Sequence, residues 1–241
     1  MLTLHQFPIS PFCDKIRRIL HVKRVPFVVR NVSLAQSATT FRKLNSIGKV
    51  PCLEDGGVVV ADSTDIARYL DEHYPTPRLL PASPRERALC HVLEDWADES
   101  LYFYEVRLRF TFARNARRTV AMLTEGEPSI VRAAAPHVLP GLMRRFTNHQ
   151  GVGRKPEAMV LRDVERHVEA ISGWLDGGAF LVGETLTLAD ISVFAQLSRI
   201  RETEEGARLV AAKPDVVAWM DRIAQATAGE PVEPAEIAAP H

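Results

Sequence analysis

The sequence predicts a small α/β domain with a mixed four-stranded sheet, followed by an all-α domain. Up to residue 74, short apolar segments rich in β-branched residues alternate with amphipathic segments in the order βαβ-ββα. Four prolines then punctuate residues 75–84, and the strand pattern nearly disappears after them. We therefore expect one domain over 1–78, an all-helical domain over 84–228 and a disordered tail over 229–241.

Each element of the first domain has its own signal. Apolar runs bounded by proline or glycine predict strands, periodic apolar residues predict helices, and Asp55-Gly56-Gly57 predicts a hairpin turn. The expected strands are 1–7, 25–34, 49–55 and 57–62. One expected helix begins at Pro11, and another begins at Ser63, which we expect to be its N-cap. Residues 41–48 are expected to form a short helix or turn.

The second domain shows helical periodicity almost throughout. Thr187-Leu188-Ala189-Asp190 has the T-x-x-D pattern of a capping box and predicts a helix start. The expected helices are 85–121, 129–148, 157–176, 188–204 and 214–227.

Composition limits the classes of function. The chain has 241 residues and a hydrophobic fraction of 46%, and 30 basic residues balance 30 acidic residues. A net charge of zero argues against nucleic-acid binding driven by phosphate neutralisation. The three cysteines are widely spaced, which predicts neither a disulfide framework nor a metal site and indicates a reducing compartment. With no apolar run long enough to cross a bilayer, we expect a cytoplasmic protein that binds no membrane.

The tetrapeptide Ser10-Pro11-Phe12-Cys13 opens the first helix. Serine is a favoured N-cap and proline a favoured first helical residue, so an ordinary helix start would explain it. A helix N-terminus also stabilises an anion such as a thiolate. Ser10 is the candidate donor to the thiolate of a bound ligand, and Cys13 is the candidate to react itself. We favour Ser10, and we favour packing over reactivity for Cys13.

Two further motifs are compatible with ligand binding. Pro51 lies just inside a strand, where it cannot donate a ladder hydrogen bond, and this favours a special junction that leaves the Val50 backbone open to an extended peptide. Asp62 and Ser63 precede an amphipathic helix. One interpretation is ordinary capping of this helix. The other is a binding site for the head group of an amino acid, in which Asp62 would bind the ammonium group and Ser63 the carboxylate.

Together, four stretches resemble the cytosolic glutathione transferase superfamily over about residues 1 to 226: SPFCDKIRRIL, GKVPCL, ADSTDIARYL and FLVGETLTLADISV. The N-terminal motif is similar to the serine-type, tau-like and omega-like members. The resemblance implies a thioredoxin-like first domain with a cis Pro51, and Ser10 as the catalytic residue. It also implies that glutathione contacts Lys49, Val50, Pro51, Asp62 and Ser63.

The resemblance implies an enzyme that conjugates the glutathione thiolate to a small electrophile held between the two domains. Candidates for the electrophile pocket are Phe12, Tyr102, Phe103 and Arg107. Glutathione is the implied co-substrate, no metal is implied, and a homodimer is expected. Two alternatives stay open: a non-catalytic glutathione-binding or protein-interaction module with the same fold, and a thiol-disulfide oxidoreductase or peroxidase that uses Cys13. The arginines from Arg107 to Arg118 predict a solvated face, with recognition of an anionic co-substrate as the sharper alternative.

Overall fold

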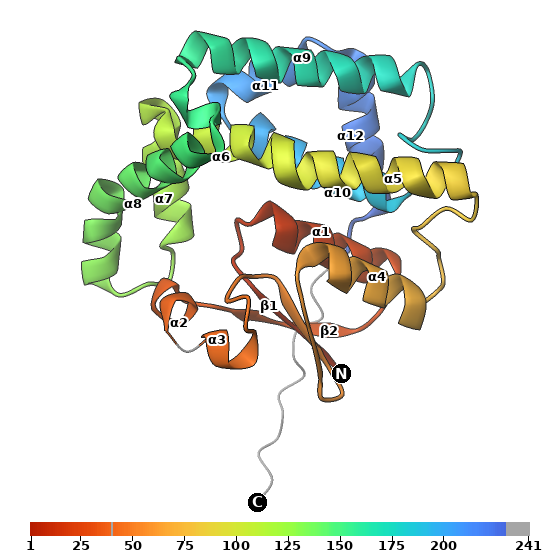
Figure 1. Cartoon of the computed structure of the whole chain (residues 1–241), viewed down its shortest axis with the longest axis horizontal. Helices are drawn as coiled ribbons and strands as arrows, with labels where there is room; N and C mark the ends of the chain where they lie inside the picture. The colour runs from red at the N-terminus through yellow and green to blue at the C-terminus, as the bar shows by residue number, and fades with distance from the viewer. Residues whose placement is uncertain (40, 230–241) are drawn as a thin grey trace, which may run out of the picture. The chain divides into compact units, whose positions relative to one another are not determined.

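The computed structural model describes residues 1–39 and 41–229 (Figure 1). The chain forms two compact units, one built from Met1–Pro77 and the segment that starts at Ala226, the other from Arg78–Gln225. The tail expected to be disordered lies outside the described residues, apart from Gly229.

The first unit is built on the predicted four-stranded mixed sheet, with strand order β2-β1-β3-β4. β1 runs parallel to β2, β3 is antiparallel to β1, and β3 and β4 form a hairpin. Gly56 and Gly57 make the two-residue turn of this hairpin with φ of 55° and 95°, values that glycine adopts without steric cost. The strands are β1 (Leu2–Gln6), β2 (Phe27–Asn31), β3 (Cys52–Asp55) and β4 (Val58–Ala61).

Helices α1 (Pro11–Val22) and α4 (Ser63–His73) pack side by side on one face of the sheet (Figure 1). Each turns an apolar stripe inward, with Ile16, Ile19 and Leu20 buried on α1. The other face buries Cys52 with Phe41 and Val32. Phe41 belongs to the short α3 (Phe41–Leu44), and a further helix that we did not expect, α2 (Leu34–Ala38), starts at a Ser33–Gln36 capping box.

The buried ammonium group of Lys23 fastens the chain where it leaves the first unit. Its Nζ contacts an Asp71 carboxylate oxygen at 2.9 Å and donates to the carbonyl oxygens of Tyr74 at 2.8 Å and Pro77 at 2.9 Å. These contacts hold the proline-rich segment against α1 and α4.

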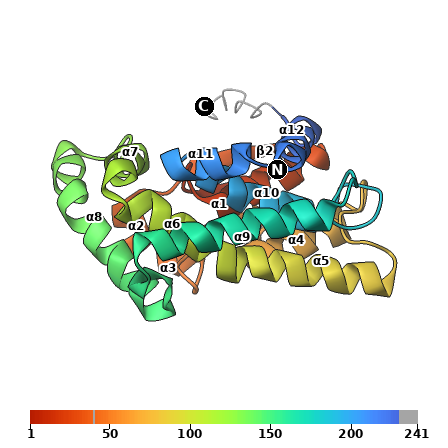
Figure 2. The same ribbon diagram turned by 90° about the horizontal axis from the view of Figure 1, so that it is seen from above.

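The second unit is helical, as predicted, although its helices are shorter and more numerous. In both ribbon views α9 runs alongside α5 and α6, and Trp96 and His167 make a ring contact between them (Figure 2). The helices are α5 (Pro84–Trp96), η1 (Ala97–Leu101), α6 (Tyr102–Thr111), α7 (Ala113–Leu123), α8 (Ser129–Gln150), η2 (Val152–Arg154), α9 (Glu157–Leu175), α10 (Leu188–Arg201), α11 (Glu204–Ala211) and α12 (Pro214–Ala226).

The prediction of one helix over 85–121 was wrong. The segment contains a π-helical turn at Ala97–Leu101, and it breaks at Phe112, whose backbone is extended at φ −77° and ψ 120°. Phe112 is fully buried, and the guanidinium groups of Arg107 and Arg114 each lie 5.4 Å from the centre of its ring. Burial of this ring outweighs continued helical hydrogen bonding, a tertiary effect that local periodicity does not reveal.

The predicted capping box at Thr187 and Asp190 is present at the start of α10. Asp190 has no exposed surface, and it accepts hydrogen bonds from four donors. These are the Leu181 N–H at 2.8 Å, the Thr187 N–H at 3.0 Å, the Thr187 hydroxyl at 2.7 Å and Trp219 Nε1 at 3.1 Å. One carboxylate therefore ties together the loop before α10, the start of α10 and α12.

Among the described residues, no helix has both the length and the apolar character needed to cross a membrane. Over the same residues, no group of three or more His, Cys, Asp or Glu side chains is arranged to hold a metal ion.

Candidate functional site

Ser10 is the N-cap of α1, as the sequence predicts. Its backbone is extended at φ −75° and ψ 127°, Pro11 follows as the first helical residue, and Ser10 Oγ accepts a hydrogen bond from the Cys13 N–H at 3.4 Å. The Ser10 side chain is half-buried, and its hydroxyl also lies within hydrogen-bonding reach of the Cys13 thiol. The hydroxyl lies at the N-terminus of α1, where a ligand could accept its proton in place of the Cys13 thiol.

Cys13 lies one turn into α1 and has no exposed surface. Burial raises the pKa of its thiol to about 11, against the opposing effects of the hydrogen bond to Ser10 and the Arg17 charge. At neutral pH the thiol is therefore protonated, while nucleophilic attack and disulfide exchange need the thiolate. This environment is that of a packing residue. Cys13, Cys52 and Cys90 are all free and buried, and no bridge joins Cys13 to Cys52.

A network of side chains that we did not predict braces the loop before Ser10. Arg17 donates to the Pro8 carbonyl oxygen at 3.3 Å, to Asp14 Oδ1 at 3.1 Å and to Gln6 Oε1. Arg18 donates to the second Asp14 oxygen at 2.8 Å. Through these contacts the two arginines fix the path of the chain from β1 into α1.

The Val50–Pro51 peptide bond is cis, as the resemblance implied. The buried Asn45 shapes the approach to it, because Asn45 Nδ2 donates to the Lys49 carbonyl oxygen at 2.7 Å and Asn45 Oδ1 accepts from the Ile47 N–H at 2.9 Å. Lys49 itself is exposed. Within the described residues, the Val50 backbone makes no hydrogen bond, so its polar groups are open to an extended ligand.

Asp62, and not Ser63, is the N-cap of α4, which corrects our prediction. Asp62 Oδ1 accepts from the Thr64 N–H at 2.8 Å, and Ser63 is the first helical residue. Asp62 has φ 75°, a left-handed backbone value that is rare for residues other than glycine. Such strain is typical of functional sites, although it does not establish one. Asp62 is exposed and Ser63 is buried.

Strand register brings these three segments to one edge of the sheet. His5 pairs with Cys52, so the loop from β1 to Ser10 leaves the sheet next to Pro51. Cys52 pairs in turn with Ala61, so Asp62 follows β4 on the other side of Pro51. The N-terminus of α1 with the Ser10 hydroxyl, the Val50 backbone and the exposed Asp62 carboxylate therefore lie along the same edge.

The second unit contains three of the remaining candidates. Tyr102 and Phe103 are half-buried and their rings lie 5.4 Å apart, in edge contact. Arg107 and Arg109 are buried, which contradicts the prediction of a solvated face, while Arg114, Arg117 and Arg118 are exposed as predicted. Phe12, the fourth candidate, is half-buried and lies on α1 in the first unit.

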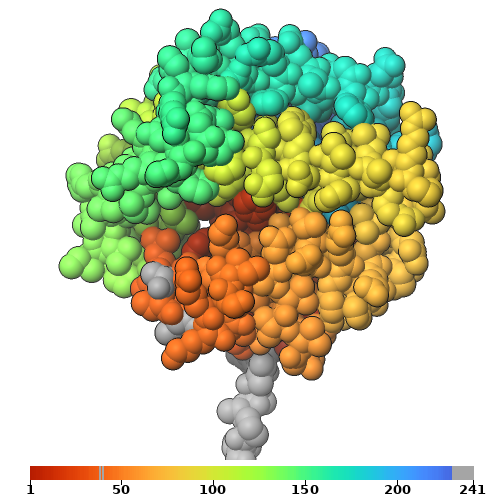
Figure 3. All heavy atoms as spheres, in the orientation of Figure 1, coloured from red at the N-terminus to blue at the C-terminus, as the bar shows by residue number. Residues whose placement is uncertain are grey.

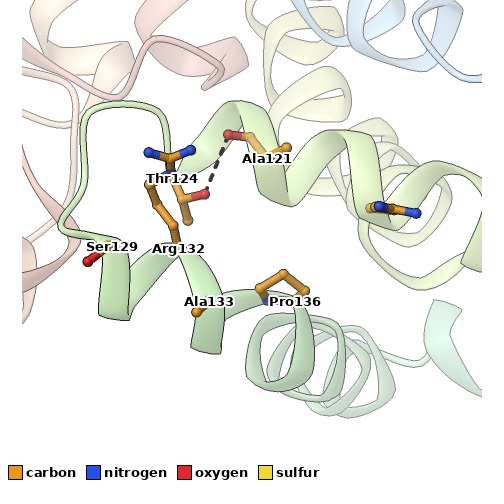
Figure 4. A pocket seen from close by; sticks show the side chains of 7 residues that line it. Ala121, Thr124, Ser129, Arg132, Ala133 and Pro136 are labelled. Carbon is orange, nitrogen blue, oxygen red and sulfur yellow. Dashed lines mark hydrogen bonds between the residues drawn. The ribbon is translucent and has the colours of Figure 1, made fainter.

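A cavity of about 460 Å³ lies between α7 and α8 (Figure 4). None of the predicted site residues lines it, and both of its arginines are exposed. Its lining residues are Arg117, Ala121, Thr124, Ser129, Arg132, Ala133 and Pro136.

Comparison with protein families agrees with this arrangement. The family model described as "Glutathione S-transferase, N-terminal domain" matches residues 4–78, and that described as "Glutathione S-transferase, C-terminal domain" matches residues 130–226. The chain belongs to the cytosolic glutathione transferase superfamily.

Individual members of the superfamily are distant from this chain. Glutathione S-transferase 3 of Zea mays is 29% identical over 238 residues, which cover 92% of this chain and 89% of that protein. Glutathione S-transferase Z2 of Arabidopsis thaliana is 38% identical over 91 residues, so the match spans 36% of this chain and only 41% of that relative. FtsZ-localized protein A of Caulobacter vibrioides is 27% identical over 202 residues, covering 82% and 76% of the two chains.

Solved structures of the superfamily share the fold. The crystal structure of the beta-etherase LigF from Sphingobium sp. strain SYK-6 superimposes with a TM-score of 0.68 at 25% identity, covering 92% of this chain and 94% of that one. The fold and the superfamily are therefore established, while the activity of this member depends on its own site residues.

Proposed function

We propose that the protein is a glutathione transferase in which Ser10 stabilises the glutathione thiolate for attack on a small electrophile. The observation that carries the proposal is the meeting of Ser10, the Val50–Pro51 junction and Asp62-Ser63 at one edge of the sheet. Each of these segments offers a group that complements a different part of glutathione.

The chemistry follows from the groups present. The Ser10 hydroxyl donates a hydrogen bond to the glutathione sulfur, and the N-terminus of α1 adds its dipole. Both favour the thiolate over the thiol, so the sulfur loses its proton to solvent near neutral pH. The thiolate then forms a bond to the electrophilic carbon, and the electron pair of the broken bond departs with the leaving group.

The rest of glutathione has matching partners on the first unit. Asp62 complements the ammonium group of the γ-glutamyl residue, and Ser63, at the N-terminus of α4, complements its carboxylate. The backbone of Val50 pairs with the cysteinyl residue beside Pro51, and Lys49 reaches the glycyl carboxylate. These contacts with glutathione are proposals, and so are the cytoplasmic location and the homodimeric state.

Calorimetry on a matched pair of variants tests the binding site. Asp62→Ala removes a charge-assisted contact to the ammonium and should weaken glutathione binding roughly tenfold to a hundredfold. Asp65→Ala removes another exposed carboxylate, from the first turn of α4, and should leave the affinity unchanged. Equal affinity for the wild type and Asp62→Ala would remove this carboxylate from the site.

A second candidate function is a binding module without turnover. Its support is the similarity to FtsZ-localized protein A, whose name describes localisation and not catalysis. Glutathione binding without conjugation of activated aryl halides or enones, and without glutathione-dependent reduction of peroxides, would favour this alternative. The third candidate, disulfide exchange through Cys13, is disfavoured by the burial of that thiol and its raised pKa.

A further inference from the structure

A buried side chain shapes the loop that leads from α3 to the Val50–Pro51 junction. Asn45 is only 3% exposed, and both ends of its amide are hydrogen-bonded. Nδ2 donates to the Lys49 carbonyl oxygen at 2.7 Å, and Oδ1 accepts from the Ile47 N–H at 2.9 Å. One side chain therefore holds two points of the loop, two and four residues further along the chain.

The backbone of Asn45 is itself tied to the core of the first unit. Its N–H donates to the Phe41 carbonyl oxygen at 3.0 Å, and Phe41 packs against the buried Cys52. The carbonyl oxygen of Asn45 accepts from the Gly48 N–H at 2.9 Å, which closes a turn. Gly48 has φ 68°, and a Cβ at this position would lie 2.8 Å from Arg42 Cγ. The turn is therefore closely constrained, and the Asn45 amide is held in a fixed place.

The bond from Asn45 to the Lys49 carbonyl also determines where the next N–H points. The Lys49–Val50 peptide bond is trans and planar, so its carbonyl oxygen and the Val50 N–H point in opposite directions. A hydrogen bond to one end of this peptide unit therefore fixes the direction of the other end. The Val50 N–H points away from Asn45, and in the part of the chain that the structure describes it has no acceptor.

This N–H belongs to a segment that a ligand can reach. The Val50 side chain packs partly buried against the core cluster that contains Phe41 and Cys52, while Lys49 beside it is exposed. The space-filling view shows the segment that follows α3, in orange, at the surface of the first unit (Figure 3). A backbone donor whose direction is fixed by a buried side chain is preorganised, so a ligand that accepts from it need not order the loop first.

We propose that Asn45 is a positioning residue that aims the Val50 N–H at the carbonyl oxygen of the cysteinyl residue of glutathione. The inference deepens the proposed function and rests on it, because glutathione is the ligand that accepts from Val50. Asn45 touches neither the sulfur nor the reacting atoms, and it acts only through the Lys49–Val50 peptide unit. Its loss should therefore weaken binding without changing the ionisation of the thiol.

Calorimetry with S-methylglutathione tests this role apart from the chemistry, because this ligand has the glutathione backbone but no thiol to ionise. Asn45→Asp keeps the shape of the side chain and the oxygen that accepts from Ile47, and it replaces the donor with an oxygen that repels the Lys49 carbonyl. The affinity should fall roughly threefold to tenfold, as expected for one misaligned hydrogen bond. Asn45→Ser, which is neutral and too short to reach Lys49, should weaken binding by a similar factor.

The neutral variant excludes repulsion between the new charge and the anionic ligand as the cause, and it replaces Asn45→Asp if that variant does not fold. Ser46→Ala, at the exposed neighbouring position of the same loop, is the matched control and should leave the affinity unchanged. Wild-type affinity in the folded Asn45→Ser variant overturns the proposal. So does an equal loss in Ser46→Ala, because any disturbance of the loop would then have the same effect.

Nuclear magnetic resonance of protein made with isotope-labelled valine observes the Val50 N–H directly, and its resonance is assigned by its absence from Val50→Ile. Saturating S-methylglutathione should shift this amide proton downfield in the wild type, because a new hydrogen bond forms. The shift should be smaller in Asn45→Ser, a change that lower stability alone would not produce. An unshifted Val50 amide in the wild type, or an equal shift in the variant, overturns the proposal.

These measurements separate failure of this inference from failure of the proposed function. If the wild type and the Asn45 variants bind S-methylglutathione equally well, Asn45 has no positioning role and the glutathione site stands. If the wild type does not bind this ligand, the proposed function fails and the inference fails with it. In a turnover assay, Asn45→Ser should raise KM for glutathione by the factor seen in calorimetry and leave kcat nearly unchanged, whereas an equal fall in kcat would contradict a role confined to binding.

Discussion

Replacing Asp190 by alanine should destabilise the second unit more than any loss of a surface carboxylate. The side chain accepts four hydrogen bonds at a position with no solvent exposure. Its removal leaves buried donors on Leu181, Thr187 and Trp219 without their acceptor, each at a cost of about 1–3 kcal/mol, and it also removes a helix cap worth about 0.5–2 kcal/mol. Since water entering the space would satisfy some of these donors, we expect a loss of about 3–5 kcal/mol.

Urea denaturation followed by far-ultraviolet circular dichroism measures this loss as a lower midpoint. Asp221→Ala is the control, because Asp221 is an exposed residue of the same unit whose 3.7 Å pair with Arg201 should contribute about 0–1 kcal/mol. A midpoint for Asp190→Ala that matches the Asp221→Ala midpoint would refute the reasoning. Unchanged stability with collapsed turnover would instead indicate a chemical role for Asp190.

The remaining predictions concern the first unit and the cysteines. Lys23→Ala should lower the free energy of unfolding by about 3–5 kcal/mol, and with it the urea midpoint, because it breaks a buried ion pair with Asp71. Lys43→Ala, at an exposed position, should have little effect, and equal midpoints for the two variants would show that the buried pair is dispensable. Burial raises the pKa of Cys13, Cys52 and Cys90 to about 11 each, so iodoacetamide at pH 8 should label the native protein slowly and the unfolded protein at all three thiols. Rapid labelling of Cys13 in the native protein, detected by mass spectrometry, would contradict its packing role.

Features set by local chemistry could be predicted from the sequence. The N-cap at Ser10, the hairpin turn at Gly56-Gly57 and the capping box at Thr187 and Asp190 each depend on a few adjacent residues whose preferences are strong. The mixed four-stranded sheet followed from the same local signals together with the resemblance to the superfamily, whereas the order of its strands was not predicted.

Features that depend on tertiary contacts could not be predicted from the sequence. Nothing local marks Phe112 as the break between α6 and α7, because the break exists to bury its ring against Arg107 and Arg114. The ion pair between Arg109 and Glu105 could have been predicted from the sequence, because Glu105 precedes Arg109 by four residues on one helix. The absence of any such acid for Arg107 becomes visible only once the surrounding helices are in place.

The candidate site also contains residues that could be predicted from the sequence and residues that could not. Ser10, Pro51 and Asp62 were identified from their motifs, while Asn45 and Arg17, which hold the flanking loops, were missed because their partners are backbone carbonyls and side chains remote from any motif. The role of N-cap was assigned to Ser63 instead of Asp62 because serine and aspartate are equally favoured caps, and only the backbone at Asp62 decides between them.

The most direct test of the account is the ultraviolet titration of glutathione thiolate in its complex with the wild type and with Ser10→Ala and Cys13→Ala. A hydrogen bond to a charged group is worth about 1.5–3 kcal/mol, so loss of the Ser10 hydroxyl should raise the pKa of bound glutathione by about one to two units and slow conjugation about tenfold to a hundredfold at neutral pH. Cys13→Ala should leave that pKa nearly unchanged, and Ser10→Cys should gain mixed-disulfide chemistry because it restores a Cys-Pro-x-Cys spacing. If Cys13→Ala abolishes the thiolate or the turnover while Ser10→Ala does not, the chemistry belongs to the cysteine and the central claim is wrong.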